Sequence, residues 1–245
     1  MVTSEPSVTP GERLYFPMRT NQTGEELWTT DGTAAGTYSL GDLAPGSTGG
    51  YCSVGVAVAS GRVEFSAQSN AGDCELWTTD GSAEGTHLVV DLAPEGASAP
   101  DAFVRLGART FFRASTVGRG TELWVSDGTA AGTLPLDDLV PGDGSSLPTP
   151  FGEAGGRLIF TVRQGFQAVP YSTDGTAGSL RALVPGLRGS VRPVGWQQGE
   201  DLLFESSEVV GSTLRVSLWR TRGTPETTTR MAEFAVQQLT EHRVA

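Results

Sequence analysis

The amino-acid sequence predicts an all-β fold: a five-bladed β-propeller with four antiparallel strands in each blade. One short motif recurs five times along the 245 residues, at intervals of 47 to 49 residues. Short apolar runs separated by Gly-containing turns lie between the copies, which is typical of β-strands. No segment has the 3.6-residue period that a helical repeat would need. A period of this length with four strands fits a propeller blade.

The motif is Glu-Leu-Trp, two further residues, and Asp-Gly-Thr. Its copies occupy residues 26–33, 75–82, 122–129, 171–176 and 218–224. Ser82 replaces the Thr of the second copy, the fourth copy lacks Glu-Leu-Trp, and Arg222 replaces the Asp of the fifth. A second motif that ends in Phe recurs in phase, at residues 13–16, 62–65, 109–112, 157–160 and 201–204. The common phase predicts a single domain over 1–245, with blade repeats at 11–50, 51–98, 99–147, 148–190 and 191–235.

The second repeat shows the strands of a blade most clearly. We expect strands at 54–59, 62–67, 75–79 and 86–91, connected by a Gly turn, a variable loop and the Asp-Gly-Thr turn. In the first copy of the motif, Leu27 and Trp28 are neighbours and therefore point to opposite sides of the sheet. Apolar residues on both sides are expected of a blade that packs between two others.

The phase of the repeats also predicts how the ring closes. The chain begins near the second strand of the first blade and continues for one strand, residues 236–245, beyond the last blade. We expect this C-terminal strand to complete the first blade, because an open stack would leave sheet edges exposed. The alternative is a strand at residues 2–8, which Pro6 and Pro10 disfavour.

Composition excludes several classes of function. The net charge of −11 repels phosphate backbones and anionic lipids, so we expect neither nucleic-acid binding nor membrane insertion. All 17 basic residues are Arg, and the absence of Lys excludes Schiff-base chemistry. The two His residues, His87 and His242, lie in different repeats, and there are two Cys, so we expect no metal and no cofactor.

No run of 18 apolar residues predicts a transmembrane helix, and residues 1–10 lack the pattern of a signal peptide. If the protein is secreted, we expect the signal peptide to be missing from this sequence. We expect a monomer.

The repeated residues resemble those of the bacterial ELWxxDGT-repeat proteins, named after this motif. The match is good at residues 26–33, 75–82 and 122–129, and the in-phase repeat covers nearly the whole chain. The resemblance implies a propeller-like fold and a secreted or surface location, and it carries no established reaction. By repeat length, the chain also looks like five-bladed animal lectins with one sugar site per blade.

The repeated Asp and Trp residues each have a functional and a structural interpretation. Asp-Gly turns can bind calcium, but each offers one carboxylate where calcium needs six to eight oxygens. We therefore expect the Asp to cap the turn and the Gly to supply a positive φ. The motif aromatics are Trp28, Trp77, Trp124, Tyr171 and Trp219, which we expect to pack between blades. Trp196 lies outside this series and is a candidate for a binding pocket.

Glu64 breaks the repeat, because Tyr15, Phe111, Ile159 and Leu203 stand at the equivalent positions. A carboxylate there needs a partner, and a salt bridge with a nearby Arg is the favoured explanation. The alternative is catalysis, since positions that break a rule often serve function. Glu64 is then the one weak catalytic candidate. Neither Glu205 nor Asp101 is predicted to pair with it as a glycosidase requires.

Cys52 and Cys74 are predicted to form a disulfide. Strands alternate in direction, so the connection that enters the first strand of a blade and the loop between its second and third strands share one face. Both cysteines fall at this face of the second blade. A disulfide implies an oxidising compartment.

The same face carries the variable loops, where binding sites are usually found on a rigid scaffold. The ligand-contact candidates are Asn21, Asn70, Asp73, Arg119, Gln164, Phe166 and Trp196. Because they differ from blade to blade, we expect one glycan or protein partner across the face and not five identical sites. The sequence thus predicts an extracellular binding module, with a propeller hydrolase or a purely structural repeat unit as alternatives.

Overall fold

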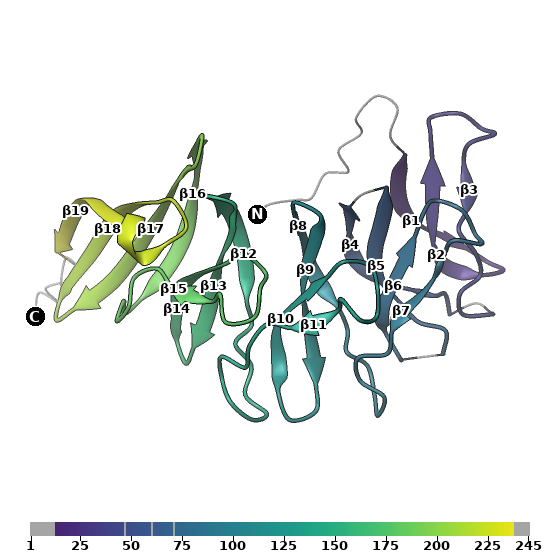
Figure 1. Cartoon of the computed structure of the whole chain (residues 1–245), viewed down its shortest axis with the longest axis horizontal. Helices are drawn as coiled ribbons and strands as arrows, with labels where there is room; N and C mark the ends of the chain where they lie inside the picture. Colours follow the sequence, from purple (N-terminus) through teal and green to yellow (C-terminus); the bar gives the residue numbers. More distant parts are fainter. Residues whose placement is uncertain (1–12, 47, 60, 71, 238–245) are drawn as a thin grey trace, which may run out of the picture. The chain divides into compact units, whose positions relative to one another are not determined.

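Five antiparallel β-sheets make up the structure, a computed structural model that describes residues 13–46, 48–59, 61–70 and 72–237. Four sheets have four strands and the first has three. Strands that follow one another in the chain are neighbours in each sheet (Figure 1). No α-helix occurs in these residues, and one 3-10 turn, η1 (Pro225–Thr227), precedes the last strand. The predicted all-β class is confirmed.

The strand bounds follow the predicted repeats. The first sheet contains β1 (Leu14–Thr20), β2 (Gly24–Thr30) and β3 (Tyr38–Ser39). The second contains β4 (Tyr51–Ala59), β5 (Arg62–Ala67), β6 (Glu75–Thr79) and β7 (His87–Val90). The third contains β8 (Asp101–Leu106), β9 (Arg109–Thr116), β10 (Gly120–Ser126) and β11 (Leu134–Pro135). The fourth contains β12 (Thr149–Ala154), β13 (Arg157–Gln164), β14 (Gln167–Thr173) and β15 (Arg181–Ala182). The fifth contains β16 (Ser190–Gln198), β17 (Asp201–Val210), β18 (Thr213–Thr221) and β19 (Thr229–Gln237).

In the second sheet, two of the four strands have the predicted bounds. The first strand begins three residues earlier than predicted, and the last is one residue shorter at each end. The last strand contains a register shift between the residues paired with Leu76 and Trp77.

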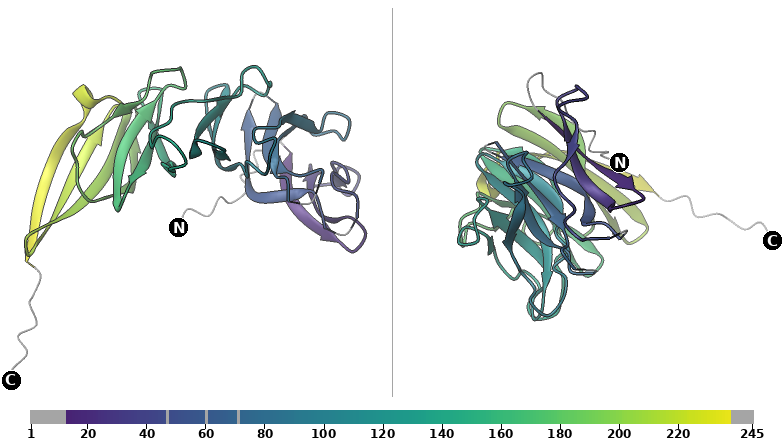
Figure 2. Two further views of the ribbon diagram at one scale, coloured as in Figure 1. Left: turned by 90° about the horizontal axis from the view of Figure 1, so that it is seen from below. Right: turned by 90° about the vertical axis from the view of Figure 1, so that its right-hand side faces the viewer.

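The chain divides into two units. The first ends at Gly144 and holds the first three sheets, and the second begins at Ser145 and holds the last two. A single domain of five repeats therefore stays a prediction. The views of Figure 2 show the fifth sheet as a twisted layer with β19 at one edge.

The two repeated motifs meet directly across strands. In every sheet the Phe that ends the second motif pairs with the aromatic residue of the first. The pairs are Phe16–Trp28, Phe65–Trp77, Phe112–Trp124, Phe160–Tyr171 and Phe204–Trp219. Ring centroids in the last three pairs are 6.1 to 6.5 Å apart. Such aromatic cross-strand pairs stabilise a sheet by about 0.2–1 kcal/mol each and help to fix its register.

The hydrophobic core lies between consecutive sheets of each unit. Leu27 of the first sheet packs with Phe65 of the second, and Leu76 of the second packs with Phe112 of the third. In the second unit, Ile159 clusters with Leu202 of the fifth sheet. Both faces of a middle sheet are therefore apolar, as predicted. In β6 of the second sheet, for example, Trp77 packs in the cluster shared with the first sheet, and its neighbour Leu76 packs in the cluster shared with the third.

The Asp-Gly-Thr turns are closed by side-chain hydrogen bonds. Asp31 Oδ1 accepts hydrogen bonds from the backbone N–H and the hydroxyl of Thr33, at 2.9 and 2.7 Å. Asp80, Asp127 and Asp174 make the same two bonds in their own turns. The following Gly residues have φ between +82° and +92°. The predicted capping role of the Asp is confirmed, and the hydroxyl contact lowers the pKa of each of these carboxyls.

The turn motif extends further than the sequence pattern indicated. Gly36, Gly85 and Gly132 follow the Asp by five residues, and a Cβ at any of them would lie 2.0 to 2.1 Å from an Asp carboxylate oxygen. Hydroxyl-bearing residues at the two ends of the turn also hydrogen-bond in all five sheets. These pairs are Thr30–Thr37, Thr79–Thr86, Ser126–Thr133, Thr173–Ser179 and Thr221–Thr228. The fifth turn keeps its pair although it has lost its Asp.

The predicted closing strand, residues 236–245, is wrong for its first two residues. Val236 and Gln237 belong to β19 and pair with Leu214 and Thr213 of β18, because β18 is long enough to hold them. The rest of the predicted strand, and the alternative at residues 2–8, lie outside the described residues. The first sheet has no fourth strand among the residues described.

Replacing Gly85 by Ala tests the close approach in the turn. We expect the folded state to lose about 2 kcal/mol, because the new methyl group displaces Asp80 from the two hydrogen bonds of its cap. Urea unfolding measures the loss. Gly96→Ala is the matched control, because a Cβ there meets nothing within 4 Å. Equal midpoints for the two variants would contradict the steric account.

Candidate functional site

The loops between second and third strands lie beside the connections between consecutive sheets. Backbone hydrogen bonds of 2.6 to 2.8 Å join them in the second, third and fourth sheets. The donor–acceptor pairs are Gln68 N with Gly50 O, Ser115 N with Ser98 O, and Arg163 N with Ser146 O. The loop and the connection thus form one continuous polar edge on each of these sheets. This is the edge at which the sequence places the binding face.

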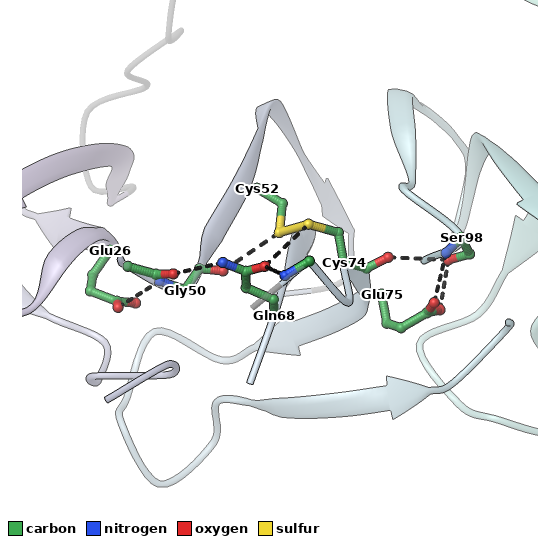
Figure 3. Close-up of a disulfide and its surroundings, with 9 residues drawn as sticks. Glu26, Gly50, Cys52, Gln68, Cys74, Glu75 and Ser98 are labelled. Atoms are coloured by element: carbon green, nitrogen blue, oxygen red, sulfur yellow. Dashed lines mark hydrogen bonds between the residues drawn. A yellow bond between two sulfur atoms is a disulfide. The ribbon is translucent and has the colours of Figure 1, made fainter. Parts of the chain in front are cut away.

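The Glu of the Glu-Leu-Trp motif fastens the connection to the sheet. Glu75 is buried and accepts hydrogen bonds from Leu92 N at 2.8 Å, Ser98 N at 2.7 Å and the Ser98 hydroxyl at 2.6 Å (Figure 3). Glu26 likewise accepts hydrogen bonds from Gly50 N at 2.7 Å and Leu43 N at 3.4 Å. One carboxylate therefore holds both ends of the chain segment that leads to the next sheet.

Glu122 occupies the same place in the third sheet and accepts a hydrogen bond from Leu139 N at 3.4 Å. Burial raises the pKa of Glu26 and of Glu75, and the hydrogen bonds from the backbone oppose this rise. Sequence reasoning gave these three Glu residues no role. Their recurrence at buried strand positions was the available signal, because a buried carboxylate needs fixed donors.

The predicted disulfide between Cys52 and Cys74 is confirmed, with an S–S distance of 2.07 Å. It joins the start of β4 to the loop before β6, next to the two Glu contacts (Figure 3). Gln68 lies beside it: its Nε2 donates to Gly49 O at 2.9 Å and its Oε1 accepts from Gly72 N at 2.7 Å. The disulfide sulfurs carry no proton, so their 3.8 Å approaches to Gly50 O and Gln68 Oε1 are contacts and not hydrogen bonds. The bond favours an oxidising compartment over the cytoplasm.

The structure places the predicted contact residues of the first unit in its loops. Asn21 and Asn70 are exposed, and Asp73 and Arg119 are half-buried. The backbone N–H of Asp73 donates to the carbonyl of Asn70 at 3.2 Å, so these two belong to one turn. Asn21 and Arg119 lie on the hairpins of the first and third sheets. Four candidates are therefore spread over three hairpins of one edge.

The remaining candidates lie in the second unit. Phe166 is fully exposed at the two-residue tip of the β13–β14 hairpin, and Gln164 beside it donates to the Tyr171 hydroxyl at 3.4 Å. Trp196 is 41% exposed and stands at the register shift between β16 and β17. It is therefore a surface residue, unlike the Trp residues of the motif.

The sequence interpretation missed apolar residues at the hairpin tips. Val117, Val209 and Val210 are exposed in the hairpins of the third and fifth sheets, and Val117 is 82% exposed. Asp143, from the connection that follows the third sheet, accepts a hydrogen bond from Gly118 N at 3.1 Å and holds that tip. Valine within a connecting hairpin was the signal, because such turns are normally polar.

Three of the four motif Trp residues are packing residues, and two of them pack between sheets as predicted. Trp77 and Trp124 belong to the core clusters of the first unit. Trp219 stacks on Phe204, with ring centroids 6.2 Å apart, and donates its Nε1–H to the Ser206 hydroxyl at 2.9 Å. Stacking platforms for sugars are therefore not available at these three positions.

The favoured explanation of Glu64, a salt bridge with Arg, is wrong within the part of the chain described. Glu64 is buried and its Oε1 accepts a hydrogen bond from the Ser126 hydroxyl of the third sheet at 2.9 Å, while Oε2 has no hydrogen-bond partner. The neighbouring sheet supplies a hydroxyl at this position, so Glu64 needs no cation. Burial raises its pKa, and the hydroxyls of Thr110 and Ser126 oppose the rise.

The three carboxyls considered for catalysis lie on separate sheets. Glu64 is on the second sheet, Asp101 pairs with Arg113 in the third, and Glu205 pairs with Arg192 in the fifth at 2.8 Å. Asp101 and Glu205 are therefore each neutralised by an Arg of their own sheet.

Two shallow clefts lie at the Asp-Gly-Thr turns. One of about 370 Å³ is lined by Arg62, His87 and residues 127–130, and the other, of about 330 Å³, includes Arg157 and Arg181. None of the predicted contact residues lines either cleft. Across the described ranges, no group of three or more His, Cys, Asp or Glu residues is placed to hold a metal ion. In the same residues, no helix is long and apolar enough to cross a membrane.

Comparisons with known proteins identify the fold and no family. A scan of protein-family models finds no match, and a search of curated proteins finds none. Among solved structures, the chain is similar to one of two prolyl endopeptidases studied for inter-domain dynamics. The identity is 9% and the TM-score 0.56, and the match covers 93% of this chain and 34% of that one.

A second similar structure is oligopeptidase B from Leishmania major, with 14% identity, a TM-score of 0.53, and coverage of 92% of this chain and 33% of that one. TolB from Acinetobacter baumannii matches with 14% identity, a TM-score of 0.47, and coverage of 92% and 52%. The chain thus spans about a third of the peptidase chains and half of TolB. These neighbours are β-propeller proteins. At such identities the likeness shows the fold alone, so the sheets are blades of the propeller type.

Replacing Glu64 by Gln tests its buried, partly unpaired carboxyl. The pKa of Glu64 is raised in the folded state, so wild-type stability falls as the pH rises through that pKa. Gln keeps an acceptor for Ser126 and does not titrate. We expect the variant to gain about 1 kcal/mol over wild type at pH 7 and to lose that advantage towards pH 4.

Chemical denaturation at several pH values measures the difference in unfolding free energy. Glu84→Gln, at an exposed position of the same blade, is the control and should show no such trend. A stability difference that does not change with pH would show that Glu64 is ionised at no cost.

Proposed function

We propose that the protein is an extracellular binding module that recognises a protein partner through its hairpin-tip surface. We define this surface as the tips of the hairpins between second and third strands together with the connections beside them. The observation that supports the proposal is the exposure of apolar side chains at these tips. Val117, Phe166, Val209 and Val210 stand in the hairpins of three consecutive sheets.

Exposed apolar tips on a rigid frame suit protein recognition. Phe166 follows Gly165, which has a φ of +63°, in a two-residue turn between β13 and β14. A short turn of this kind holds the ring out with little freedom to fold back. Burying such an aromatic side chain in a partner's pocket gives a large share of binding energy for a small loss of entropy.

The charge of the first unit favours a cationic partner. Residues 1–144 contain seven Arg and nineteen Asp or Glu residues, a net charge of −12. A surface of one sign accelerates encounter with partners of the opposite sign. In the closed ring proposed below, both features would lie on one face, which a basic protein segment with apolar side chains would match.

A glycan is the second candidate among ligands, and two observations disfavour it. Five equal sugar sites would need the same polar residues in every hairpin, but Asn21, Asn70, Arg119 and Gln164 differ in type or position. Three of the four motif Trp residues pack inside the sheets. Phe166 and Trp196 are the aromatic side chains left for stacking on a sugar.

Among the described residues, the hydrolase alternative rests on Glu64 alone. Glu64, the one catalytic candidate, lies on the second sheet and its hydrogen-bond partner is a serine hydroxyl. Glycosidase chemistry needs a second carboxyl about 5–9 Å away. Asp101 and Glu205 lie on other sheets and are paired with Arg residues.

We further propose that the five sheets form a single closed ring and that the protein acts outside the cytoplasm. The in-phase motifs and the propeller neighbours support the ring, and the disulfide supports the location. The relation to the bacterial ELWxxDGT-repeat proteins rests on the motif itself.

Selection of peptides tests the proposed function. A random peptide library displayed on phage is selected on the immobilised protein, and the recovered peptides are synthesised. We expect basic peptides with apolar side chains, and we expect Phe166→Ser to weaken their binding by about tenfold or more. Isothermal titration calorimetry measures the affinities.

Leu134→Ser is the control, because Leu134 is 54% exposed in β11 and lies outside the hairpin tips. Equal losses for the two variants, or no selected peptide, would overturn the proposal. Binding to a glycan array that Phe166→Ser abolishes would show instead that the surface recognises sugars.

Small-angle X-ray scattering of the dilute protein tests the ring. A closed ring of 245 residues should have a radius of gyration of about 18 Å, as other single domains of this length have. An open row of sheets would give a clearly larger value, and that result would contradict closure.

A further inference from the structure

The last strand of the fifth sheet is an unusually long edge strand. β19 has nine residues, whereas the strands at the same place in the other four sheets have two or four. It pairs with β18 on both sides of a register shift at Met231 and is the last strand of its sheet (Figure 2). Its other side has no strand partner among the described residues.

β19 has only part of the usual protection of an edge strand: it carries Arg230, Glu233 and a register shift at Met231. Edge strands are normally short, or carry charges or Pro that prevent pairing with another chain. β19 contains no Pro and no Gly, and it exposes Met231 at 53% and Phe234 at 60%. Its one acidic residue, Glu233, forms ion pairs with Arg230 and with Arg215 of β18, so its charge is balanced within the sheet.

The exposed apolar residues of the protein concentrate on this sheet. Eleven large hydrophobic residues are exposed in the described part of the chain, and six of them belong to strands β16, β17 and β19. These six are Val194, Trp196, Val209, Val210, Met231 and Phe234. An exposed apolar cluster on a soluble protein marks an interaction site.

We propose that β19 pairs antiparallel with β19 of a second copy of this chain, so that two fifth sheets form one continuous sheet. Antiparallel pairing of identical strands satisfies a two-fold axis, the commonest symmetry of dimers. This proposed dimer differs from the monomer that the sequence analysis predicted.

The distribution of net charge along the chain favours association of two copies through the fifth sheet. Residues 145–245 contain ten Arg and nine Asp or Glu residues, a net charge of +1. The first unit carries −12, so copies that met there would repel. The second unit is therefore the part through which two identical acidic chains can associate.

The residues of β19 favour one register. Residues directly opposite each other in an antiparallel pair point to the same face, so the two-fold axis must pass through a residue that faces its own copy. If this residue is Phe234, its ring lies opposite Phe234 of the partner subunit, and aromatic pairs of this kind stabilise a sheet. An axis at Glu233 would place two carboxylates opposite each other, which destabilises a strand pair. We infer the first register.

The association is expected to be weak, because one pair of strands buries less surface than the roughly 1,200 Å² of a small stable interface. Val209 and Val210 belong to the hairpin-tip surface as well, but the strand pairing itself is made by β19, so the two proposals are tested separately. Light scattering coupled to size-exclusion chromatography, from about 1 µM to about 1 mM protein, tests the association. We expect the mass to rise from 25.6 kDa towards twice that value.

Phe234→Arg should keep the protein monomeric over this range. Leu134→Arg is the matched control, because it adds the same charge at an exposed apolar position of another edge strand, and it should still dimerise. Phe166→Ser should also dimerise, which separates this inference from the proposed function. A wild-type mass that stays at 25.6 kDa, or equal behaviour of Phe234→Arg and Leu134→Arg, would overturn the inference.

Cross-linking tests the register. Met231→Cys and Phe234→Cys chains with different tags are mixed under mild oxidation with oxidised glutathione. The native cysteines are already paired and do not compete. We expect the disulfide between two Phe234→Cys chains to form faster than the mixed disulfide or the disulfide between two Met231→Cys chains. Equal rates would rule out the inferred register and the pairing that depends on it.

Discussion

The buried carboxylate of the Glu-Leu-Trp motif is the interaction on which the arrangement of the blades depends. In the first and second sheets, Glu26 and Glu75 accept backbone N–H groups from both ends of the segment that leads to the next sheet. Hydrogen bonds to a charged acceptor are stronger than neutral ones, and a buried carboxylate is costly unless all its donors stay in place. Each of these sheets therefore fixes where its successor begins.

The rest of the polar edge follows from this constraint. Because the connections are fixed, the loops that hydrogen-bond to them are fixed as well, and the disulfide of the second sheet adds a covalent link at the same place. The opposite edge is closed by the Asp-capped turns and their hydroxyl pairs. Side chains at the hairpin tips thus project from sheets whose two edges are both held by hydrogen bonds, as the proposed recognition surface requires.

The positions that depart from the repeat mark where the molecule differs from a plain scaffold. Glu64 places a carboxyl where the other sheets have apolar side chains, and the Ser126 hydroxyl of the third sheet donates a hydrogen bond to it. β19 is long where its equivalents are short, and it leaves apolar side chains exposed. In both cases the repeat supplies the expectation, and the departure shows a feature specific to this chain.

The sequence by itself determined the class of fold, the number of repeats and the second-sheet strands to within three residues, because period, turn residues and apolar runs act locally. It also determined the disulfide, since two independent placements brought Cys52 and Cys74 to one face. Only the tertiary structure decided what each buried polar group contacts. The partners of Glu26, Glu64 and Glu75 come from other strands, connections or sheets, at separations that no local pattern encodes. The exposure of Phe166 and the open edge of β19 were decided in the same way, because burial depends on which neighbours the fold brings near.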